Sequence, residues 1–378
     1  MTAVSFARVE QEIEAAVQRG VFPGAVLLVR DGERMFYLRA FGQRQNEPTP
    51  APMEEDTIFD LSSLTKALAT TPAVMLLVRD GKVRLEDRVT RFLHNFGVYG
   101  KTHVTLRHLL AHCSGLAATR PYYKEILQME RRGEKINFLG SGAAKEYVYQ
   151  QISRERPEAP PGVRAVYSDL GFILLGALVE LTSATTLDRF CHTHIFRPLG
   201  LRATSFIDLA MVRSRRIVPA TEMIAPTERC PWRQHVLCGE VHDDNAYAMG
   251  GVAGHAGLFA SARDVDTLLC HLRACWNGQD GFVPPAIVRE FWTRDGTPGS
   301  TWTLGWDTPS PTGSAAGRRF SATTVGHLGF TGTSVWVDLE RDRHVLLLSN
   351  RVHPSHDNNL IREFRPVIHD LVNEALTA

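Results

Sequence analysis

Two β-hairpin patterns at opposite ends of the chain constrain the fold most strongly. Near the start, GAVLLVR, the turn DGE and RMFYLRAFG predict two strands joined by a short connection. Near the end, SVWVDL, the turn ERDR and HVLLLSN predict a second hairpin. Both hairpins are apolar enough to be covered on a face. The simplest packing places them in one antiparallel sheet, which brings the two chain ends together.

Helical patterns accompany both hairpins. Apolar residues from Phe6 to Val17 fall on one face of a helix that ends at Gly20. A final helix is expected over residues 359–376, with Pro366 as a kink. We expect these two terminal helices to flank the sheet.

The middle of the chain has a helical pattern. Good helix formers run from Ala67 to Arg79, with Pro72 as a kink, and Thr105 can cap the helix of LRHLLAH. We therefore expect an α/β domain built from residues 1–60 plus 255–378. A mostly helical domain, residues 61–254, is inserted between its two parts.

Composition excludes several classes of protein. The chain has 378 residues and a formal net charge of +1, so it carries no basic footprint for nucleic acid or for an anionic membrane. No stretch approaches the roughly 18 apolar residues that span a bilayer. The first residues lack the apolar core of a signal peptide, so we expect a cytoplasmic protein, or a periplasmic one if a leader has been removed. The six cysteines form no C-x-x-C pair and are expected to be free thiols.

The segment FDLSSLTKALATT places a serine one helical turn before a lysine. Ser63 and Lys66 stand at i and i+3, about 5–6 Å apart between Cβ atoms on a helix. A serine hydroxyl needs an adjacent base to act as a nucleophile. Desolvation and a nearby cation would lower the pKa of Lys66 enough for that role. The alternative is an N-capping serine beside a solvated lysine.

Three further segments bear on this choice. Tyr167 in RAVYSDLGFILLG stands at the start of an apolar helix and could relay a proton if Lys66 holds its pKa down, or it could be a core tyrosine. His327 in VGHLGFTGTSVWVDL begins a glycine-rich strand that could hold a substrate against the backbone, or a simple turn. LLAHCSGL is read alone as a helix end closed by Gly115.

In this order and at these separations, the segments resemble the serine β-lactamase and penicillin-binding-protein superfamily, of which S-x-x-K is a motif. The phrases SSLTK, TLRHLLAHCSGL, YSDLGFILLG, IFRPLGL, GEVHDDNAYAMGGVAGHAGLFASARDV and GHLGFTGTSVWVD resemble the branch of class C β-lactamases, D-alanyl-D-alanine carboxypeptidases and family VIII carboxylesterases. The resemblance covers residues 10 to 370. It implies an α+β fold in which an antiparallel sheet of about five or more strands is flanked by the terminal helices, with the active site at the junction with the helical domain.

The resemblance also assigns roles to residues. It implies that Ser63 is the acyl-forming nucleophile, Lys66 its proton partner and Tyr167 the tyrosine of the Y-x-N element. The backbone N–H groups of Ser63 and Phe330 would form the oxyanion hole. It further implies that three residues bind the substrate: Asp169, His327 and Gly329.

This chain departs from the family pattern at three positions. Asp169 replaces the Asn of Y-x-N, His327 replaces the Lys of K-T-G, and Leu328 replaces its Thr. Less fixed positive charge should weaken binding of free carboxylates. We therefore expect a carboxylesterase with weak or no β-lactamase activity, and keep two alternatives: an amidase or D,D-carboxypeptidase acting on peptidoglycan fragments, or a β-lactamase. A non-catalytic penicillin-binding sensor is the alternative from another class.

Other chemistries lack their motifs. The pair His108 and His112 in HLLAH lacks the Glu of H-E-x-x-H, so no zinc catalysis, metal or cofactor is expected. No G-x-S-x-G occurs, which excludes the nucleophile elbow of α/β-hydrolases. GGVAGHAG is expected to be a tight loop near the domain junction, with His255 structural. The expected partner is a small ester, amide or β-lactam, and the sequence indicates no oligomeric state.

Overall fold

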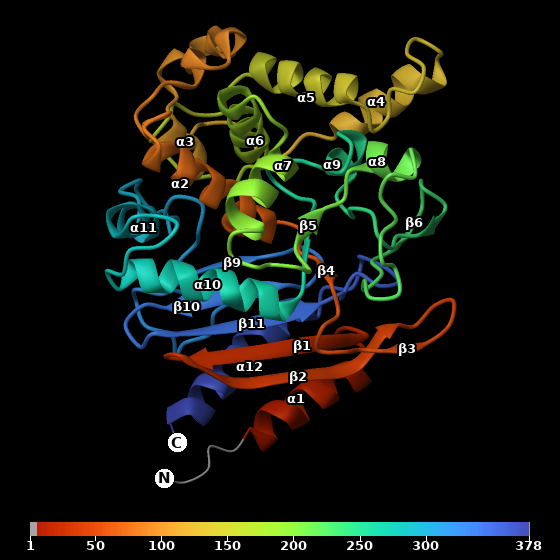
Figure 1. The fold of residues 1–378 in the computed structure, drawn as a ribbon, viewed down its shortest axis with the longest axis vertical. Coiled ribbons are helices and arrows are strands. Elements are labelled where there is room, and N and C mark those ends of the chain that lie inside the picture. Colours follow the sequence, from red (N-terminus) through yellow and green to blue (C-terminus); the bar gives the residue numbers. More distant parts are fainter. Residues whose placement is uncertain (1–5, 378) are drawn as a thin grey trace.

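The computed structural model describes residues 6–377. Figure 1 shows a sheet in the half of the molecule that holds both chain ends, with most helices gathered in the other half. Helices α1 (Ala7–Gln18) and α12 (Ile361–Thr377) cover one face of this sheet, and α10 (Ala262–Trp276) lies over the other face (Figure 1). The predicted α+β fold with flanking terminal helices is confirmed.

The main sheet has six strands in the order β3-β2-β1-β11-β10-β9, all antiparallel to their neighbours. Both predicted hairpins are present, and their strands β1 and β11 pair at the centre of the sheet, from Ala25 opposite Ser349 to Asp31 opposite Arg343. The first and last thirds of the chain therefore form one sheet. Its strands are β1 (Gly24–Asp31), β2 (Arg34–Gln45), β3 (Ala51–Pro52), β9 (Val325–Leu328), β10 (Ser334–Asp338) and β11 (Arg343–Ser349).

Strand β1 is buried on both faces because each face meets a different layer. Val26 and Leu28 belong to the large core shared with the helical half, whereas Leu27 and Val29 pack in a smaller core with the terminal helices. Side chains alternate between faces along a strand, so a continuous apolar run suits a strand covered on both sides. Each such side chain contributes about 1.5–3 kcal/mol of hydrophobic stabilisation.

Residues between the two parts of the sheet are largely helical. The α-helices there are α2 (Thr71–Arg79), α3 (Leu106–Leu110), α4 (Tyr122–Arg131), α5 (Gly142–Arg154), α6 (Asp169–Ser183), α7 (Leu187–Cys191), α8 (Leu209–Arg213) and α9 (Asp244–Ala248). Helix α3 begins at the predicted cap, because the side chain of Thr105 accepts a hydrogen bond from the backbone N–H of His108. Two 3₁₀ segments, Val89–Arg91 and His94–His103, and a π-helical segment, His192–Phe196, lie among them.

Two small sheets and one more helix complete the fold. Strands β4 (Phe59–Asp60), β8 (Leu258–Ala260) and β5 (Ser205–Phe206) pair in the order β4-β8-β5. Strands β6 (Arg229–Cys230) and β7 (His235–Val236) form a two-stranded ribbon, and α11 (Pro285–Trp292) follows α10. Strand β4 ends three residues before Ser63 and so anchors the start of the S-x-x-K segment.

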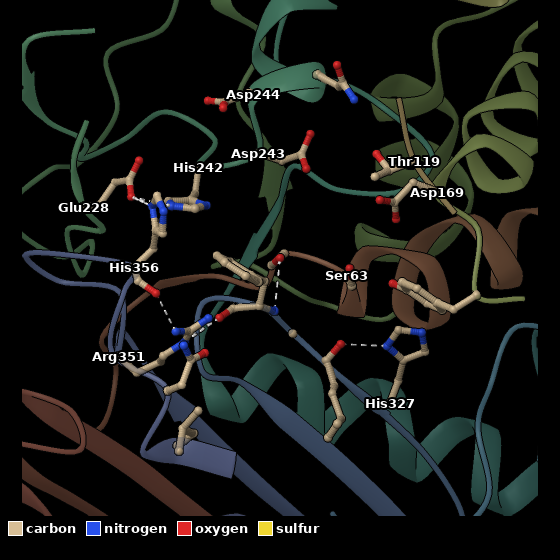
Figure 2. Close-up of a pocket in the computed structure, with 18 of the residues that line it drawn as sticks. Ser63, Thr119, Asp169, Glu228, His242, Asp243, Asp244, His327, Arg351 and His356 are labelled. Atoms are coloured by element: carbon tan, nitrogen blue, oxygen red, sulfur yellow. Dashed lines mark hydrogen bonds and ion pairs between the residues drawn. The ribbon is translucent and has the colours of Figure 1, made fainter. Parts of the chain in front are cut away.

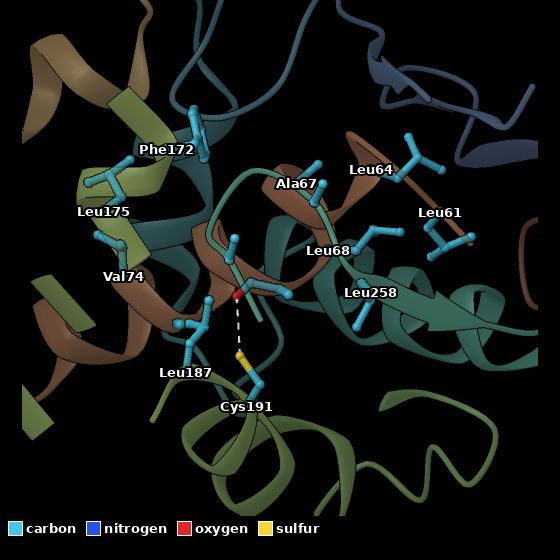
Figure 3. Close-up of a cluster of buried hydrophobic side chains, with 14 of the residues drawn as sticks. Leu61, Leu64, Ala67, Leu68, Val74, Phe172, Leu175, Leu187, Cys191 and Leu258 are labelled. Carbon is cyan, nitrogen blue, oxygen red and sulfur yellow. Dashed lines mark hydrogen bonds between the residues drawn. The ribbon is translucent and has the colours of Figure 1, made fainter. Parts of the chain in front are cut away.

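The S-x-x-K segment differs from the expected kinked helix. Lys66–Thr70 form a π-helical turn, and α2 starts only at Thr71, with Pro72 in its first turn. Proline has no N–H to donate and is tolerated in the first turn of a helix, so a new helix begins here in place of a kink. Figure 3 shows Ala67 and Leu68 in the apolar cluster that also holds Phe172 of α6 and Cys191 of α7, with the Cys191 thiol 3.8 Å from the Ala69 carbonyl.

Helix α6 is apolar around its whole circumference because neighbouring helices surround it; residues Leu170 to Val179 are all buried. Across residues 6–377, no single helix combines the length and apolar composition needed to cross a membrane. Helix α6 and the segment Leu187–Phe196 meet that test only as a pair bent by 72°.

Candidate active site

A cavity of about 730 Å³ opens between strand β9 and the helical half of the molecule. Six of the seven residues predicted for the site line it: Ser63, Tyr167, Asp169, His327, Gly329 and Phe330. The seventh, Lys66, lies directly behind Ser63 and is fully buried. Figure 2 shows Ser63, Asp169 and His327 on one side of this cavity, and Glu228, His242, His356 and Arg351 on the other.

Lys66 is held by three oxygen atoms. Its Nζ lies 3.0 Å from Ser63 Oγ, 3.0 Å from the carbonyl oxygen of His255 and 2.8 Å from Asp169 Oδ1. An ammonium group has three N–H donors, so this arrangement can satisfy all of them. The S-x-x-K turn therefore places the predicted nucleophile and its partner in direct contact.

The charge state of Lys66 differs from the expectation. Burial lowers the pKa of Lys66, but the carboxylate of Asp169 and then Tyr167 raise it further, so the net shift is upward. The prediction of a lowered pKa is therefore wrong for the resting site. The cause is the acid at the family's Asn position, because an amide there would carry no charge to hold the proton on Lys66.

Tyr167 joins Ser63 and Lys66 at the start of α6. Lys66 Nζ lies 4.8 Å from the centre of the Tyr167 ring, and both Lys66 and Ser63 lower the pKa of the phenol by hydrogen bonding. Burial raises that pKa by more, so Tyr167 is neutral and keeps its proton. Lys66 thus lowers the pKa of this phenol, as expected, but burial outweighs it and the net shift is upward.

The N-terminus of α6 fixes the position of Tyr167 and Asp169. Ser168 caps the helix by accepting from the Gly171 N–H at 3.3 Å, and its hydroxyl donates to the carbonyl of Ala117 at 2.7 Å. The Ser168 N–H donates to Nδ1 of His112 at 3.0 Å. The segment LLAHCSGL thus anchors this helix as well as ending α3.

His327 lies at the end of β9 and carries no charge. Burial and then the charge of Lys66 lower its pKa to about 3. Its Nδ1 lies 2.9 Å from the carbonyl oxygen of Leu328, and its ring is 6.0 Å from that of Tyr167. The position that holds a lysine in the family's K-T-G element therefore holds a neutral imidazole here.

Gly329 allows the turn after β9 to approach the nucleophile segment. A Cβ atom on Gly329 would lie 2.0 Å from Thr333 Oγ1 and 2.7 Å from the carbonyl oxygen of Leu61. The same turn is tied to the segment before Ser63, because the hydroxyl of Thr331 donates to the carbonyl of Asp60 at 2.7 Å. Only glycine fits this contact without displacing backbone.

The backbone N–H of Phe330, a predicted donor of the oxyanion hole, already has a hydrogen-bond partner in the resting site. Its N–H donates to Oγ of Ser62 at 3.3 Å, which is long for an N–H···O bond. Ser62 itself has a left-handed backbone with φ of 49°. A substrate oxygen that enters here must displace this weakly held hydroxyl, so Ser62 occupies the Phe330 side of the predicted oxyanion hole in the resting site.

The glycine-rich loop contributes more than was expected. The carbonyl of His255 accepts from Lys66, and His255 Nε2 lies 2.9 Å from Asp243 Oδ1, a carboxylate that lines the cavity. A Cβ on Gly254 would lie 2.0 Å from the carbonyl oxygen of Phe172, so this loop packs directly on α6. The sequence placed the loop near the domain junction but assigned no role to Asp243; the phrase GEVHDDNAYAMGG was its signal.

Aromatic residues form the wall beside Tyr167. Trp302 stacks on Tyr167 with ring centres 5.4 Å apart, and Trp302 and Tyr123 both line the cavity. Tyr122 does not, because it is buried and its hydroxyl donates to Glu155 at 3.0 Å.

Sequence comparisons identify the family of this chain. The family model described as Beta-lactamase matches residues 9–366. A putative D-alanyl-D-alanine carboxypeptidase of Escherichia coli K12 is 30% identical over 359 residues, which is 88% of this chain and 79% of that protein. An N-acetylmuramyl-L-alanine amidase of Bacillus subtilis strain 168 is 30% identical over 369 residues, covering 92% of this chain and 82% of the relative.

Solved structures share the fold. EstCE1, a hydrolase with promiscuous acyltransferase activity, aligns with a TM-score of 0.71 and 24% identity over 95% of this chain and 97% of its own. The octameric penicillin-binding protein homologue of Pyrococcus abyssi aligns with a TM-score of 0.68 and 21% identity, over 92% of this chain and 73% of that one. With the family match over nearly the whole length, the chain belongs to the β-lactamase and penicillin-binding-protein family of serine hydrolases.

Proposed function

We propose that the protein is a serine amidase that cleaves peptidoglycan-derived fragments at the amide bond between the lactyl group of muramic acid and L-alanine. The contact of 3.0 Å between Ser63 and Lys66 supports acyl transfer through Ser63. The Bacillus subtilis relative, which aligns over 92% of this chain, is named for this bond.

The observation that carries the choice of bond is the neutral His327. A D,D-carboxypeptidase must hold the free carboxylate of a terminal D-alanine beside the nucleophile, and the lysine of K-T-G meets such a group in the family. His327, with a pKa of about 3, offers no positive charge there at neutral pH. An amide whose leaving group has no carboxylate next to the scissile bond suits this site better.

The resting protonation states also favour an amide. Hydrolysis of an amide requires a proton for the leaving amine, whereas an ester needs less help. The raised pKa values of Lys66 and Tyr167 keep a proton on both groups beside Ser63. Tyr167 is then the general acid, and Lys66 returns a proton to it.

Attack by Ser63 requires a path for its own proton, because an ammonium group has no lone pair. In the proposed step, Lys66 passes a proton to Asp169, 2.8 Å away, as it accepts the proton of the Ser63 hydroxyl. The new C–O bond forms, and the carbonyl oxygen becomes an oxyanion on the N–H groups of Ser63 and Phe330. Collapse breaks the C–N bond, and water then hydrolyses the acyl-enzyme.

The test is mass spectrometry of muropeptides incubated with the enzyme. We expect release of intact stem peptides with a free L-alanine amine, and none with Ser63→Ala. Release of D-alanine alone from pentapeptides would contradict the choice of bond and favour a D,D-carboxypeptidase. A stable penicillin adduct on Ser63 with no turnover of any substrate would favour a sensor.

Carboxylesterase activity is a second candidate, and the uncharged His327 supports it because neutral esters require no cation. We expect slow hydrolysis of p-nitrophenyl butyrate and little or none of a chromogenic cephalosporin. An ester rate that exceeds the muropeptide rate by kcat/KM would make the esterase the primary function. Action on fragments in the cytoplasm, as in recycling, remains a prediction that fractionation of cells would test.

A further inference from the structure

The wall of the cavity opposite Ser63 carries a second polar centre, formed by Glu228, His242 and His356 (Figure 2). We call these residues the Glu228 cluster. They come from three distant segments: Glu228 precedes β6, His242 precedes α9, and His356 follows β11. None of them is part of the proposed acyl-transfer machinery.

The donor atoms of the Glu228 cluster converge on one point. One carboxylate oxygen and one ring nitrogen from each histidine lie within 4.8 Å of one another. Glu228 Oε2 is 3.5 Å from Nε2 of His242 and also contacts Nδ1 of His356. Ligand atoms about 2.0–2.1 Å from a tetrahedral ion stand roughly 3.4 Å apart, and the separation between Glu228 and His242 matches this. His356 contacts the carboxylate directly, so its exposed ring has to move outward to admit an ion.

The side chain of His242 directs a ring nitrogen toward this point, and that nitrogen has no hydrogen-bond partner there. Its Nε2 is buried and has no hydrogen-bond partner within residues 6–377, since 3.5 Å to the carboxylate is too long. The backbone N–H of His242 donates to Asp60 Oδ2 at 2.7 Å, which positions the residue, and its ring stacks on that of Phe330 with ring centres 5.6 Å apart. A buried, oriented and unpaired imidazole nitrogen is costly unless a ligand uses its lone pair.

Glu228 is suited to be the anionic ligand. Its side chain is only 7% exposed, so its charge is not freely solvated. His356, half-exposed at the cavity mouth, leaves a route for an ion to enter.

A second group with similar residues shows what a closed cluster looks like. Asp266, Cys270 and His344 also bring three donor atoms together. There, Arg30 takes both carboxylate oxygens at 2.6 and 2.7 Å, and His344 Nε2 lies 2.7 Å from the same carboxylate. A guanidinium already fills that position, whereas no Arg or Lys side chain within residues 6–377 forms an ion pair with the carboxylate of Glu228.

We propose that Glu228, His242 and His356 bind one Zn²⁺ ion, with a fourth coordination position open to the cavity. Two imidazoles and one carboxylate suit zinc and related transition metals, whereas Mg²⁺ and Ca²⁺ require oxygen ligands. The missing H-E-x-x-H spacing does not argue against this site, since its ligands come from three segments. The ion also supplies a positive charge to a cavity whose K-T-G lysine position is neutral.

The open position faces the same cavity as Ser63, so the ion is placed to ligate an oxygen atom of the substrate. This consequence rests on the proposed function, whereas the metal site itself does not. The role is one of binding and orientation; the acyl transfer remains with Ser63.

The first experiment measures the site without catalysis. Full-length protein is stripped with a chelator and titrated with ZnCl₂ by calorimetry, and with Co²⁺ while its visible absorption is recorded. We expect one equivalent of either metal and the intense visible bands of low-coordinate Co²⁺. His242→Ala and Glu228→Gln should each weaken binding by more than about 100-fold.

Control variants test whether zinc binding depends on the Glu228 cluster and not on other histidine or cysteine residues. His271→Ala removes an exposed histidine of α10, and Cys270→Ala alters the closed cluster; both should bind zinc like the parent protein. Ser63→Ala should also bind normally, so that loss of hydrolysis and loss of the metal site are distinguishable. Absence of zinc binding in the parent protein, or undiminished binding in folded His242→Ala, overturns the proposal.

A second measurement addresses the substrate. Adding a muropeptide to Co²⁺-loaded Ser63→Ala should shift the visible bands, because a substrate oxygen enters the coordination shell. Unchanged bands, with the muropeptide shown to bind by calorimetry, would overturn ligation of the substrate while the metal site stands.

Discussion

Asp169 Oδ1 lies 2.8 Å from Lys66 Nζ, so the acid at the family's Asn position is bound to the proton partner of the nucleophile. The ion pair raises the pKa of Lys66 although burial lowers it. In the proposed step Lys66 passes its proton to Asp169, so the resting ion pair is the reactive form. Asp169→Asn removes this proton acceptor and should lower kcat/KM at neutral pH, with activity that rises as the pH increases and Lys66 loses its proton to solvent; pH–rate profiles of the parent and the variant measure this difference.

The control for this variant is Asp244→Asn. Asp244 also lines the cavity but binds Arg233 at 2.9 Å and not Lys66, so its pH–rate profile should match that of the parent. A parent-like profile in a folded Asp169→Asn would show that Asp169 takes no part in the proton path.

The two neighbouring serines should behave differently. Ser63→Ala should abolish the acyl-enzyme and lower kcat by at least about 10⁴-fold. Ser62→Ala removes only the hydroxyl that engages the Phe330 N–H at 3.3 Å, and should change kcat by less than about tenfold. Intact-protein mass spectrometry after fluorophosphonate labelling checks both. Equal losses of kcat in the two folded variants would mean that the nucleophile has been assigned to the wrong serine.

Proton transfer should depend on both partners of Ser63. Lys66→Ala and Tyr167→Phe should each lower kcat by about 10²–10⁴-fold, the usual range for acid–base groups. Tyr167→Phe keeps the ring that stacks on Trp302 and removes only the hydroxyl, so thermal stability should be retained. Single-turnover kinetics measure the effect; a fully active Tyr167→Phe would exclude the phenol from the mechanism.

Charge at His327 should control recognition of carboxylates. His327→Lys places an ammonium group where the resting imidazole is neutral, and a charge-assisted hydrogen bond is worth about 1.5–3 kcal/mol. We expect KM for peptides ending in D-alanyl-D-alanine to fall by about tenfold. His327→Gln, which stays neutral, is the control. An unchanged KM in His327→Lys would contradict the role assigned to the missing cation.

The buried carboxylate of Asp266 should make stability depend on pH. Burial raises its pKa, but Arg30 and His344 lower it from 3.8 to about 2. Above about pH 4 the carboxylate is ionised in both states, and its stabilisation of about 2 kcal/mol is present. As pH falls from 4 to 2, the unfolded chain binds the proton first and this stabilisation is lost. Urea unfolding between pH 2 and 6 measures the slope.

Asp266→Asn should flatten that slope and lower the free energy of unfolding by about 3 kcal/mol, because it leaves buried Arg30 without its partner. Asp342→Asn is the matched control: it breaks the pair with Arg273, but Asp342 is 44% exposed, so less than about 1 kcal/mol is expected. Equal losses of unfolding free energy in the two variants would mean that the burial of Asp266 is not the cause of its larger expected effect.

The parts of the molecule that follow from local pattern were predictable. Both hairpins, the terminal helices and the Thr105 cap depend on residue periodicity or on a single side chain near its target. The grouping of Ser63 with Lys66 follows from one helical turn. The joining of the two hairpins into one sheet followed from the need to cover their apolar faces, whereas the roles of the site residues followed from the family resemblance.

Features that depend on distant partners were not predictable. The upward pKa shift of Lys66 needs Asp169, which lies 103 positions later, to be within 2.8 Å. The π-helical turn before Pro72 depends on packing against α6 and α7. Glu228 and His356 stand 128 positions apart, so no spacing rule could bring them together.

The central pairing of β1 with β11 has a consequence for biosynthesis. During translation, strand β1 leaves the ribosome long before its partner strand β11 has been made. The turn that carries His327 and Phe330 is made some 260 residues after Ser63. A nascent or prematurely terminated chain can hold the S-x-x-K turn but not the opposite wall of the cavity. The cavity can therefore close only after the segment through β11 has been made, which ties the assembly of the site to the late pairing of β1 with β11.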